Sequence, residues 1–190
     1  MSNTTLPIYA KRSEIVSAVE TNPVVIITAE TGAGKSTQVP QYLLEEGYEL
    51  VVTQPRRLAA RTVAARVAEE FNTPLGEIVG FRTAHERQCS KKTRCLFATD
   101  GLALLRELLG IGRNTILVVD EVHEWNTNIE VLVAWAKRQI EENPDFKLVL
   151  MSATLGPAEI RDRYRRLRGA RRIEHPGDRK LEWQTWKALS

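Results

Sequence analysis

A glycine-rich segment near the N-terminus carries the residue types that recognition of a phosphate group requires. Residues 29–36 read Ala-Glu-Thr-Gly-Ala-Gly-Lys-Ser and directly follow a short apolar run. Gly32 and Gly34 allow successive backbone N–H groups to point at one anion, where a side chain would block the approach. Lys35 can reach the β and γ phosphates, and the Ser36 hydroxyl can ligate Mg²⁺. The pattern predicts a Walker A loop, whose expected cofactor-binding residues are Ala29, Glu30, Thr31, Gly32, Ala33, Gly34, Lys35, Ser36 and Thr37.

Two adjacent carboxylates end a second apolar run, Thr-Ile-Leu-Val-Val at residues 115–119. Alone, such a pair is common in solvated turns, but combined with the glycine-rich loop it indicates a Walker B strand. Asp120 is expected to hold Mg²⁺, and Glu121 to orient and deprotonate the attacking water. His123 is expected to link this site to a neighbouring element through hydrogen bonds. The predicted catalytic residues are Lys35, Asp120 and Glu121, and the predicted metal ligands are Ser36, Asp120 and Glu121.

Short apolar runs alternate with stretches of helical periodicity along the chain. The predicted strands cover residues 24–28, 50–53, 78–82, 94–99, 115–119, 147–151 and, more weakly, 172–174. The predicted helices cover residues 11–20, 35–46, 58–71, 101–109, 128–142 and 157–167. Because the clearest strand runs are apolar at every position, both of their faces are expected to be covered. The alternation predicts an α/β fold with a doubly wound, mainly parallel sheet flanked by helices, which binds ligands at the carboxyl ends of its strands.

Three residues are candidates for the ends of these helices. Gly47 follows the second predicted helix and is expected to cap its C-terminus, because glycine adopts the left-handed conformation readily. Asp100 and Thr127 precede the fourth and fifth predicted helices, and their side-chain oxygens are expected to cap the N-termini.

Length and composition restrict the class of protein. A chain of 190 residues, with 43% hydrophobic and 27% charged residues, is typical of a single globular domain, whose core is expected at about residues 6–175. No apolar run approaches the roughly 18 residues that suggest a transmembrane helix, so no membrane association is expected. Cys89 and Cys95 lack the spacing of a metal site or a disulfide framework. Free thiols in a reducing, cytoplasmic compartment are therefore expected.

Positive charge is concentrated at the C-terminal end. Residues 161–190 contain ten Lys and Arg against four Asp and Glu, whereas the net charge of the whole chain is +3. Seven arginines lie within residues 161–172. Such a cluster is consistent with contacts to phosphates, and equally with the solvated face of a helix.

Several ordered motifs resemble one family. The loop at 29–36 and the string Asp-Glu-Val-His at 120–123 are similar to those of the DEAH-box helicases of the second helicase superfamily. Thr-Gln-Pro-Arg-Arg-Leu-Ala-Ala at 53–60 resembles motif Ia, and Ala-Thr-Asp-Gly-Leu-Ala-Leu-Leu-Arg at 98–106 resembles motif Ib. Ser-Ala-Thr at 152–154 resembles motif III. The resemblance runs from about residue 6 to 155 and implies a RecA-like fold with ATP and Mg²⁺ as cofactors.

The resemblance also assigns roles outside the phosphate site. It implies that Ser152 and Thr154 couple hydrolysis to RNA binding, and that Arg66 stacks on the nucleotide base. The alternative for Arg66 is an exposed helix charge paired with Glu69 or Glu70, and both interpretations stay open. It further implies contacts to the nucleic-acid backbone from Arg56, Arg57, Thr99, Asp100 and Gly101. Such contacts position a strand without reading its sequence.

The resemblance implies two partners, single-stranded RNA, with DNA left open, and a second RecA-like domain. Nothing after Thr154 matches the motifs that such a second domain carries in this family. The chain is therefore expected to be the first motor domain of an ATP-dependent RNA helicase, weakly active or inactive alone. Two alternatives remain: another class of P-loop NTPase, and a stand-alone nucleic-acid-binding module with a vestigial NTPase site that uses the arginines at 161–172.

Overall fold

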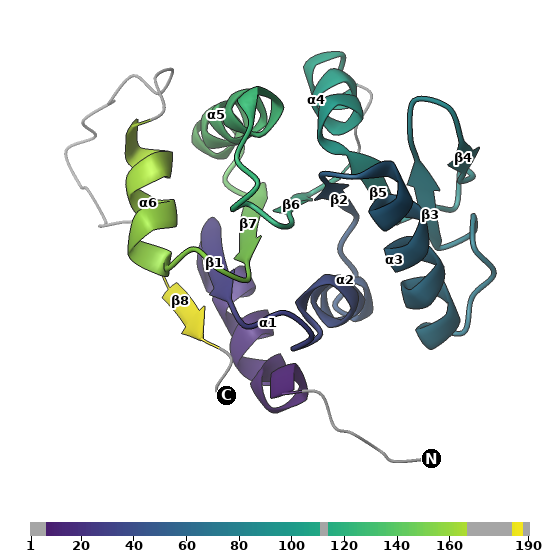
Figure 1. Ribbon diagram of the computed structural model, residues 1–190, viewed down its shortest axis with the longest axis horizontal. Coiled ribbons are helices and arrows are strands. Elements are labelled where there is room, and N and C mark those ends of the chain that lie inside the picture. The colour runs from purple at the N-terminus through teal and green to yellow at the C-terminus, as the bar shows by residue number, and fades with distance from the viewer. Residues whose placement is uncertain (1–6, 111–113, 167–183, 188–190) are drawn as a thin grey trace.

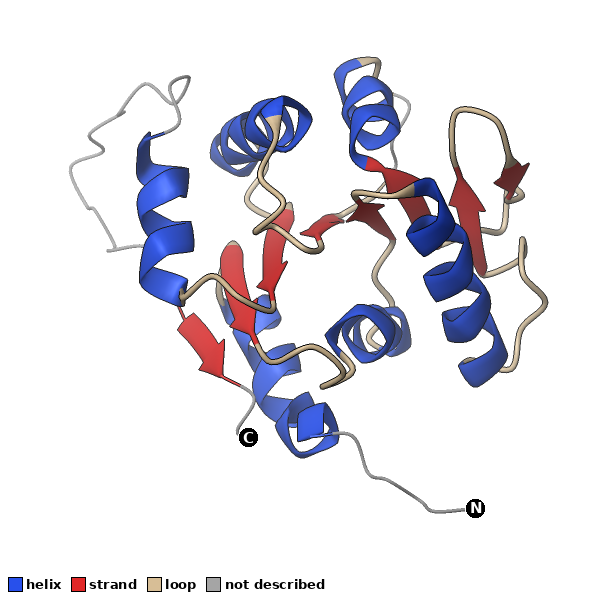
Figure 2. Cartoon of the chain, in the orientation of Figure 1, coloured by secondary structure: helices blue, strands red, loops and turns tan. Residues whose placement is uncertain are grey.

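An eight-stranded sheet forms the centre of the molecule (Figures 1 and 2), in a computed structural model that describes residues 7–110, 114–166 and 184–187. The strand order is β4-β3-β5-β2-β6-β7-β1-β8, and every pairing is parallel except that of β3 with β4. The strands are β1 (Val24–Thr28), β2 (Leu50–Gln54), β3 (Val79–Arg82), β4 (Arg87–Gln88), β5 (Cys95–Thr99), β6 (Ile116–Val119), β7 (Lys147–Ser152) and β8 (Gln184–Lys187). Because the central strands are parallel, their carboxyl ends share one edge of the sheet.

Helices cover both faces of this sheet (Figure 1). They are the 3₁₀ helix η1 (Pro7–Lys11) and the α-helices α1 (Arg12–Thr21), α2 (Lys35–Glu45), α3 (Arg57–Glu70), α4 (Asp100–Leu108), α5 (Thr127–Glu142) and α6 (Pro157–Arg166). Residues of α1, α2 and α3 pack in one apolar cluster and residues of α4, α5 and α6 in another. Successive residues of β1 alternate between the two clusters, so Val25 and Ile27 face one layer while Val24 and Ile26 face the other. The predicted doubly wound α/β sheet is confirmed.

The predicted helices agree with the structure to within about one residue at each end, and six of the predicted strands are present. The sequence does not predict β4, which has only two residues, or β8, whose sequence Gln-Thr-Trp-Lys contains no apolar run. The weak strand predicted at 172–174 lies outside the described residues. None of the helices in the described part of the chain has the length and apolarity that crossing a bilayer requires.

The predicted caps are correct at one helix and wrong at two. Gly47 follows α2 with φ +92° and donates its N–H to the Leu44 carbonyl at 3.0 Å, as expected. Asp100 and Thr127, in contrast, are the first residues of α4 and α5. The cap of α5 is Asn126, whose side-chain oxygen accepts from the Ile129 N–H at 3.1 Å. Asp100 is buried instead, with its carboxylate directed at Asn126.

Candidate functional site

The glycine-rich loop leaves β1 at the carboxyl edge of the sheet and leads into α2. Gly32 and Gly34 have φ values of +86° and +95°, a backbone conformation that side chains rarely tolerate. Gly34 precedes the first residue of α2 and makes no side-chain cap there. Since no cap fills the space, the N–H groups of the first helical turn are directed toward the loop, and the helix dipole adds positive potential. The local geometry is that of an anion-binding cradle.

The Lys35 ammonium lies inside this loop. Only 4% of Lys35 is exposed, and its Nζ donates to the carbonyl oxygens of Ala29 at 2.7 Å and Glu30 at 3.1 Å. Burial lowers the pKa of Lys35, while the nearby carboxylates of Asp120 and Glu121 oppose that shift. The fold thus places the Lys35 ammonium against the carbonyls of the glycine-rich loop and near the carboxylates of Asp120 and Glu121.

Asp120 is completely buried after β6 and contacts residues from three parts of the chain. Its Oδ2 accepts from Gln54 Nε2 at 2.6 Å, and its Oδ1 accepts from the Glu121 N–H at 2.8 Å. The side chain of Ser36 also hydrogen-bonds to it. Burial is the main cause that raises the pKa of Asp120 to about 6, with a smaller contribution from the charge of Glu121. The structure therefore brings together Ser36 and Asp120, two predicted metal ligands.

Glu121 and His123 lie on the loop that follows. Glu121 has φ +51°, a left-handed conformation that costs energy for a residue with a side chain. Its Oε2 is 3.3 Å from Nδ1 of His123. The negative charge of Glu121 favours the charged form of Lys35 and so opposes the lowering of the Lys35 pKa by burial. His123 thus lies beside a candidate catalytic carboxylate, and its link to a neighbouring element stays a prediction.

Ser152 connects the end of β7 to the same edge. Its carbonyl accepts from the Ala29 N–H at 3.2 Å, so the start of the glycine-rich loop is anchored to β7. Its buried Oγ accepts from the N–H groups of Thr154 at 3.3 Å and Leu155 at 2.9 Å. Thr154 itself is exposed. This segment contacts the candidate nucleotide site on one side and solvent on the other.

The predicted nucleic-acid residues lie at the ends of β2 and β5. Arg56, Arg57 and Gly101 are exposed, and Thr99 is half-buried just before α4. Arg56 Nη2 is 3.3 Å from Oε1 of Glu124, on the loop that begins with Asp120 and Glu121. Asp100 differs from the others: it is 4% exposed, and its Oδ2 accepts from Asn126 Nδ2 at 3.1 Å. Its side chain is therefore not available to a nucleic acid.

Arg66 lies on the exposed surface of α3. Its Nε donates to Glu70, one helical turn further on, and its Nη1 is 3.4 Å from Oε2 of Glu69. Both carboxylates that the sequence suggested as partners are therefore in contact. The side chain is still exposed to solvent.

Sequence reasoning missed Gln54 and Asn126 as parts of the site. Gln54 ends an apolar strand, a polar residue at the edge where ligands bind, and this signal was present in the sequence. Its contact with Asp120 could not be inferred, because it requires β2 to lie next to β6. Asn126 was overlooked because Thr127 is an equally suitable cap by residue type.

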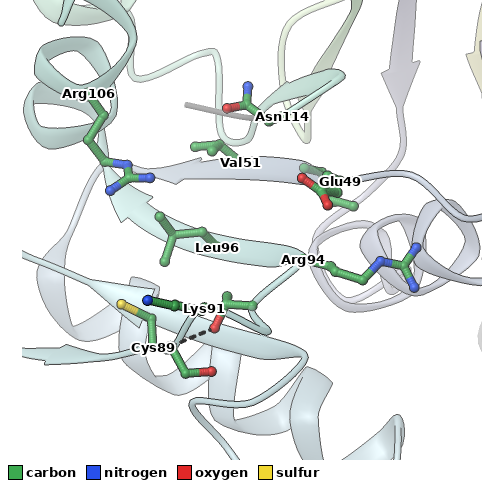
Figure 3. A pocket seen from close by; sticks show the side chains of 11 residues that line it. Glu49, Val51, Cys89, Lys91, Arg94, Leu96, Arg106 and Asn114 are labelled. Atoms are coloured by element: carbon green, nitrogen blue, oxygen red, sulfur yellow. Dashed lines mark hydrogen bonds between the residues drawn. The ribbon is translucent and has the colours of Figure 1, made fainter. Parts of the chain in front are cut away.

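A separate cavity of about 580 Å³ lies near the amino ends of β2 and β5 (Figure 3). Its floor includes Val51 and Leu96, and Lys91 and Arg106 are among its walls. The Arg94 guanidinium points away from it and donates to the carbonyls of Leu44 and Tyr48. None of the predicted site residues lines this cavity. Because phosphate chemistry needs the glycine-rich loop and the acidic strand end, the carboxyl edge is the candidate site.

The arginine-rich C-terminal region is described only as far as α6. Ile160 and Tyr164 are buried against the second apolar cluster. Arg163 Nη2 is 3.1 Å from Glu159, and its guanidinium lies 5.7 Å from the centre of the Trp125 ring. Arg165 is exposed on this packed helix, whereas Arg161 and Arg163 are half-buried, and the arginines at 168, 171 and 172 lie outside the described residues.

The chain is similar to known proteins. The DEAD/DEAH box helicase family matches residues 10–162. A protein of Drosophila pseudoobscura pseudoobscura named probable ATP-dependent RNA helicase spindle-E is 42% identical over 87% of this chain and 12% of its own length. The probable ATP-dependent RNA helicase DHR2 of Saccharomyces cerevisiae is 41% identical over 80% of this chain and 22% of its own. The DExH-box ATP-dependent RNA helicase DExH3 of Arabidopsis thaliana is 41% identical over 91% of this chain and 15% of its own length.

These relatives are much longer, and the chain spans between about a tenth and a quarter of their length. The matched region of the chain contains the glycine-rich loop, the acidic end of β6 and the segment after β7. Family and geometry therefore agree: the chain belongs to the DEAD/DEAH box helicase family.

Proposed function

We propose that this chain is the ATP-binding motor domain of a DEAH-box RNA helicase. One observation carries the proposal: Lys35, Ser36, Asp120 and Glu121, from segments more than 80 residues apart, meet at the carboxyl edge of the sheet. A triphosphate in the glycine-rich loop would find a cation, a hydroxyl and two carboxylates within reach of its terminal phosphates. Another class of P-loop NTPase is not favoured, because the family match covers residues 10–162.

Mg²⁺ suits the oxygen donors of this site. The Ser36 hydroxyl and the Asp120 carboxylate already hydrogen-bond to each other, and hard oxygen ligands combined with substrate phosphates are what Mg²⁺ prefers. When bound, the ion would neutralise charge on the β and γ phosphates. Lys35 would exchange its carbonyl partners for phosphate oxygens. Glu121 would accept a proton from the attacking water.

The RNA-binding part of the proposal concerns the adjacent loops. Arg56, Arg57 and the backbone of 99–101 would contact the phosphates of a single strand, without reading its sequence. The ion pair of Arg56 with Glu124 joins this surface to the loop that carries Glu121. Ser152 and Thr154 would couple the two sites, since Ser152 anchors the glycine-rich loop. A second RecA-like domain would complete the enzyme, and a cytoplasmic location is part of the same proposal.

Binding of a fluorescent ADP analogue with Mg²⁺, with and without a short single-stranded RNA, tests the nucleotide site. Lys35→Ala removes the cation in the loop and is expected to abolish binding. Lys92→Ala, at an exposed position, is the matched control and should bind like the parent chain. Unchanged affinity in Lys35→Ala would refute the phosphate assignment. RNA binding without any ADP binding would favour the vestigial module instead.

Hydrolysis requires a separate test, in a chain that includes the second RecA-like domain. Glu121→Gln keeps the shape of the side chain but removes the proton acceptor. ATP binding should persist while turnover is lost. If turnover remained, the general base would have to be another residue.

A further inference from the structure

The cavity near the amino ends of β2 and β5 is formed by these two strands, the turn after β4 and helix α4. Val51 of β2 and Leu96 of β5 pair in the sheet and are both buried, so together they form an apolar floor. Its volume of about 580 Å³ lies within the roughly 300–1,000 Å³ that small-molecule sites occupy. The cavity therefore has the size of a ligand site, at the edge of the sheet opposite to the glycine-rich loop.

Two cations in the walls of this cavity lack a carboxylate partner. Neither Lys91 nor Arg106 forms an ion pair with the acidic residues that the structure describes. Nε of Arg106 is buried and donates to no acceptor in that part of the chain. Burial raises the pKa of Glu107, and the Arg106 charge opposes that rise without a hydrogen bond between the two groups. Because a buried donor without an acceptor is unfavourable, an oxyanion that reached Arg106 would be stabilised.

The other charged side chains of the cavity do not neutralise these two cations. The Arg94 guanidinium points away from the cavity and donates to two backbone carbonyls of the α2 region. Glu49, an acidic residue of the lining, lies toward one end of the cavity, whereas Lys91 and Arg106 extend toward the other (Figure 3). The cavity thus has a positively charged end beside an apolar floor.

We propose that this cavity binds a small organic oxyanion, which Arg106 and Lys91 hold while its apolar body lies on Val51 and Leu96. A guanidinium can donate two parallel hydrogen bonds to a carboxylate or a phosphate, and the ammonium supplies a second positive charge. The aliphatic floor favours a body that gains from leaving water. This site is separate from the nucleotide site, because its lining includes no residue of the glycine-rich loop or of the acidic end of β6.

Isothermal titration with naphthoate, naphthyl phosphate and neutral naphthamide tests the role of the charge. The amide presents the same rings without the negative charge, so at least one of the two anions should bind about tenfold more tightly than naphthamide. Arg106→Gln and Lys91→Gln should each weaken binding of that anion about tenfold. Lys92→Gln is the matched control, because it removes an equal charge from the neighbouring exposed residue, which does not line the cavity.

The thiol of Cys89 reports whether the anion occupies this cavity. Cys89 lines the cavity and is half-buried, whereas Cys95 is fully buried and burial raises the pKa of its thiol. Alkylation of the native chain by iodoacetamide should therefore be confined to Cys89, which peptide mapping by mass spectrometry verifies. The bound anion, at about ten times its Kd, should slow this reaction about tenfold by mass action. Naphthamide at the same concentration should leave the rate nearly unchanged.

Several results would overturn the proposal. The parent chain could bind neither anion, or could bind the anions and naphthamide equally well. Anion binding could leave the reactivity of Cys89 unchanged, or Lys91→Gln could weaken it no more than Lys92→Gln does. Because Lys91 is exposed, this comparison holds even where Arg106→Gln disturbs the packing of α4. Competition by Mg²⁺–ADP would also overturn the proposal, since the anion would then occupy the nucleotide site.

Discussion

Replacing Asp120 with asparagine should stabilise the ligand-free domain while removing its response to Mg²⁺. Asp120 is fully buried, and the charged carboxylate has no exposed surface through which water could solvate it. Asparagine has nearly the same shape and keeps one oxygen to accept from the Glu121 N–H. The Gln54 amide can turn over to present its oxygen to the new NH₂ group. The change therefore removes a buried charge without leaving a cavity.

The magnitude follows from the pKa of this carboxyl. A rise from the ordinary value of 3.8 to about 6 corresponds to about 3 kcal/mol of cost for ionisation in the folded state. Because the folded-state pKa is raised, this cost is absent below pH 3.8, grows as the pH rises to about 6, and is constant above. The pKa already includes the hydrogen bonds that favour the charged form, so the offset comes from the poorer hydrogen bonds of the neutral amide, which we set at about half of the gain. The free energy of unfolding of Asp120→Asn is therefore expected to exceed that of the parent chain by about 1–2 kcal/mol at pH 7.5, which raises Tm by about 3–6 °C.

Thermal unfolding of the chain in EDTA, and again with ADP and excess Mg²⁺, measures both effects. The parent chain should gain about 2.7 kcal/mol of stability over the ligand-free state when Mg²⁺–ADP is at 100 times its Kd, and less from ADP alone. Asp120→Asn should begin from a higher Tm and gain nothing from Mg²⁺. A variant less stable than the parent in EDTA would refute the burial argument. A persistent Mg²⁺-dependent shift would refute the metal assignment.

Three further changes test the packing and polar contacts. Leu43→Ala removes a fully buried side chain from the core and should cost about 2–5 kcal/mol by urea unfolding, whereas Leu58→Ala, at a residue 72% exposed, should cost less than about 0.5 kcal/mol. Burial raises the pKa of Glu107 to about 6, so ionisation of Glu107 lowers the stability of the parent chain as the pH rises from 4.5 to 6. Glu107→Gln should remove this loss and increase the free energy of unfolding at pH 7 by up to about 2 kcal/mol. An unchanged dependence of stability on pH would contradict this. Asn126→Ala should cost about 1–2 kcal/mol in thermal unfolding, because it loses the cap of α5 and a partner of Asp100, and Asn126→Asp should retain the cap but repel Asp100. Equal stability of the two Asn126 variants and the parent would show that neither contact matters.

Local structure was largely predictable from the sequence. The phosphate loop is one contiguous segment, and its Gly32 and Gly34 adopt the positive φ values that their residue type suggests. The apolar runs at β1 and β6 are buried at every position, as expected for strands covered on both faces. These features depend on neighbouring residues in the chain, so a local pattern contains the information.

The polar contacts that shape the site were not predictable in this way. Gln54 bonds to Asp120, 66 positions later, only because the fold places β2 beside β6. Glu70 likewise reaches Gln38, 32 positions earlier, only because α3 packs beside α2. Capping was ambiguous for a smaller reason, since Asn126 and Thr127 are both good caps and one residue of register decides between them.

The sequence by itself therefore determined the class of the fold, the family and the chemistry available at the carboxyl edge, because residue type and short-range spacing encode loops, strands and helices. Only the tertiary structure decided which side chains contact one another at that edge. It buried Asp120 between Ser36 and Gln54 and directed Asp100 inward to Asn126. It also left Arg66 exposed to solvent and paired with the Glu70 carboxylate. Strand order and helix packing bring distant residues together, and local sequence patterns do not predict that order.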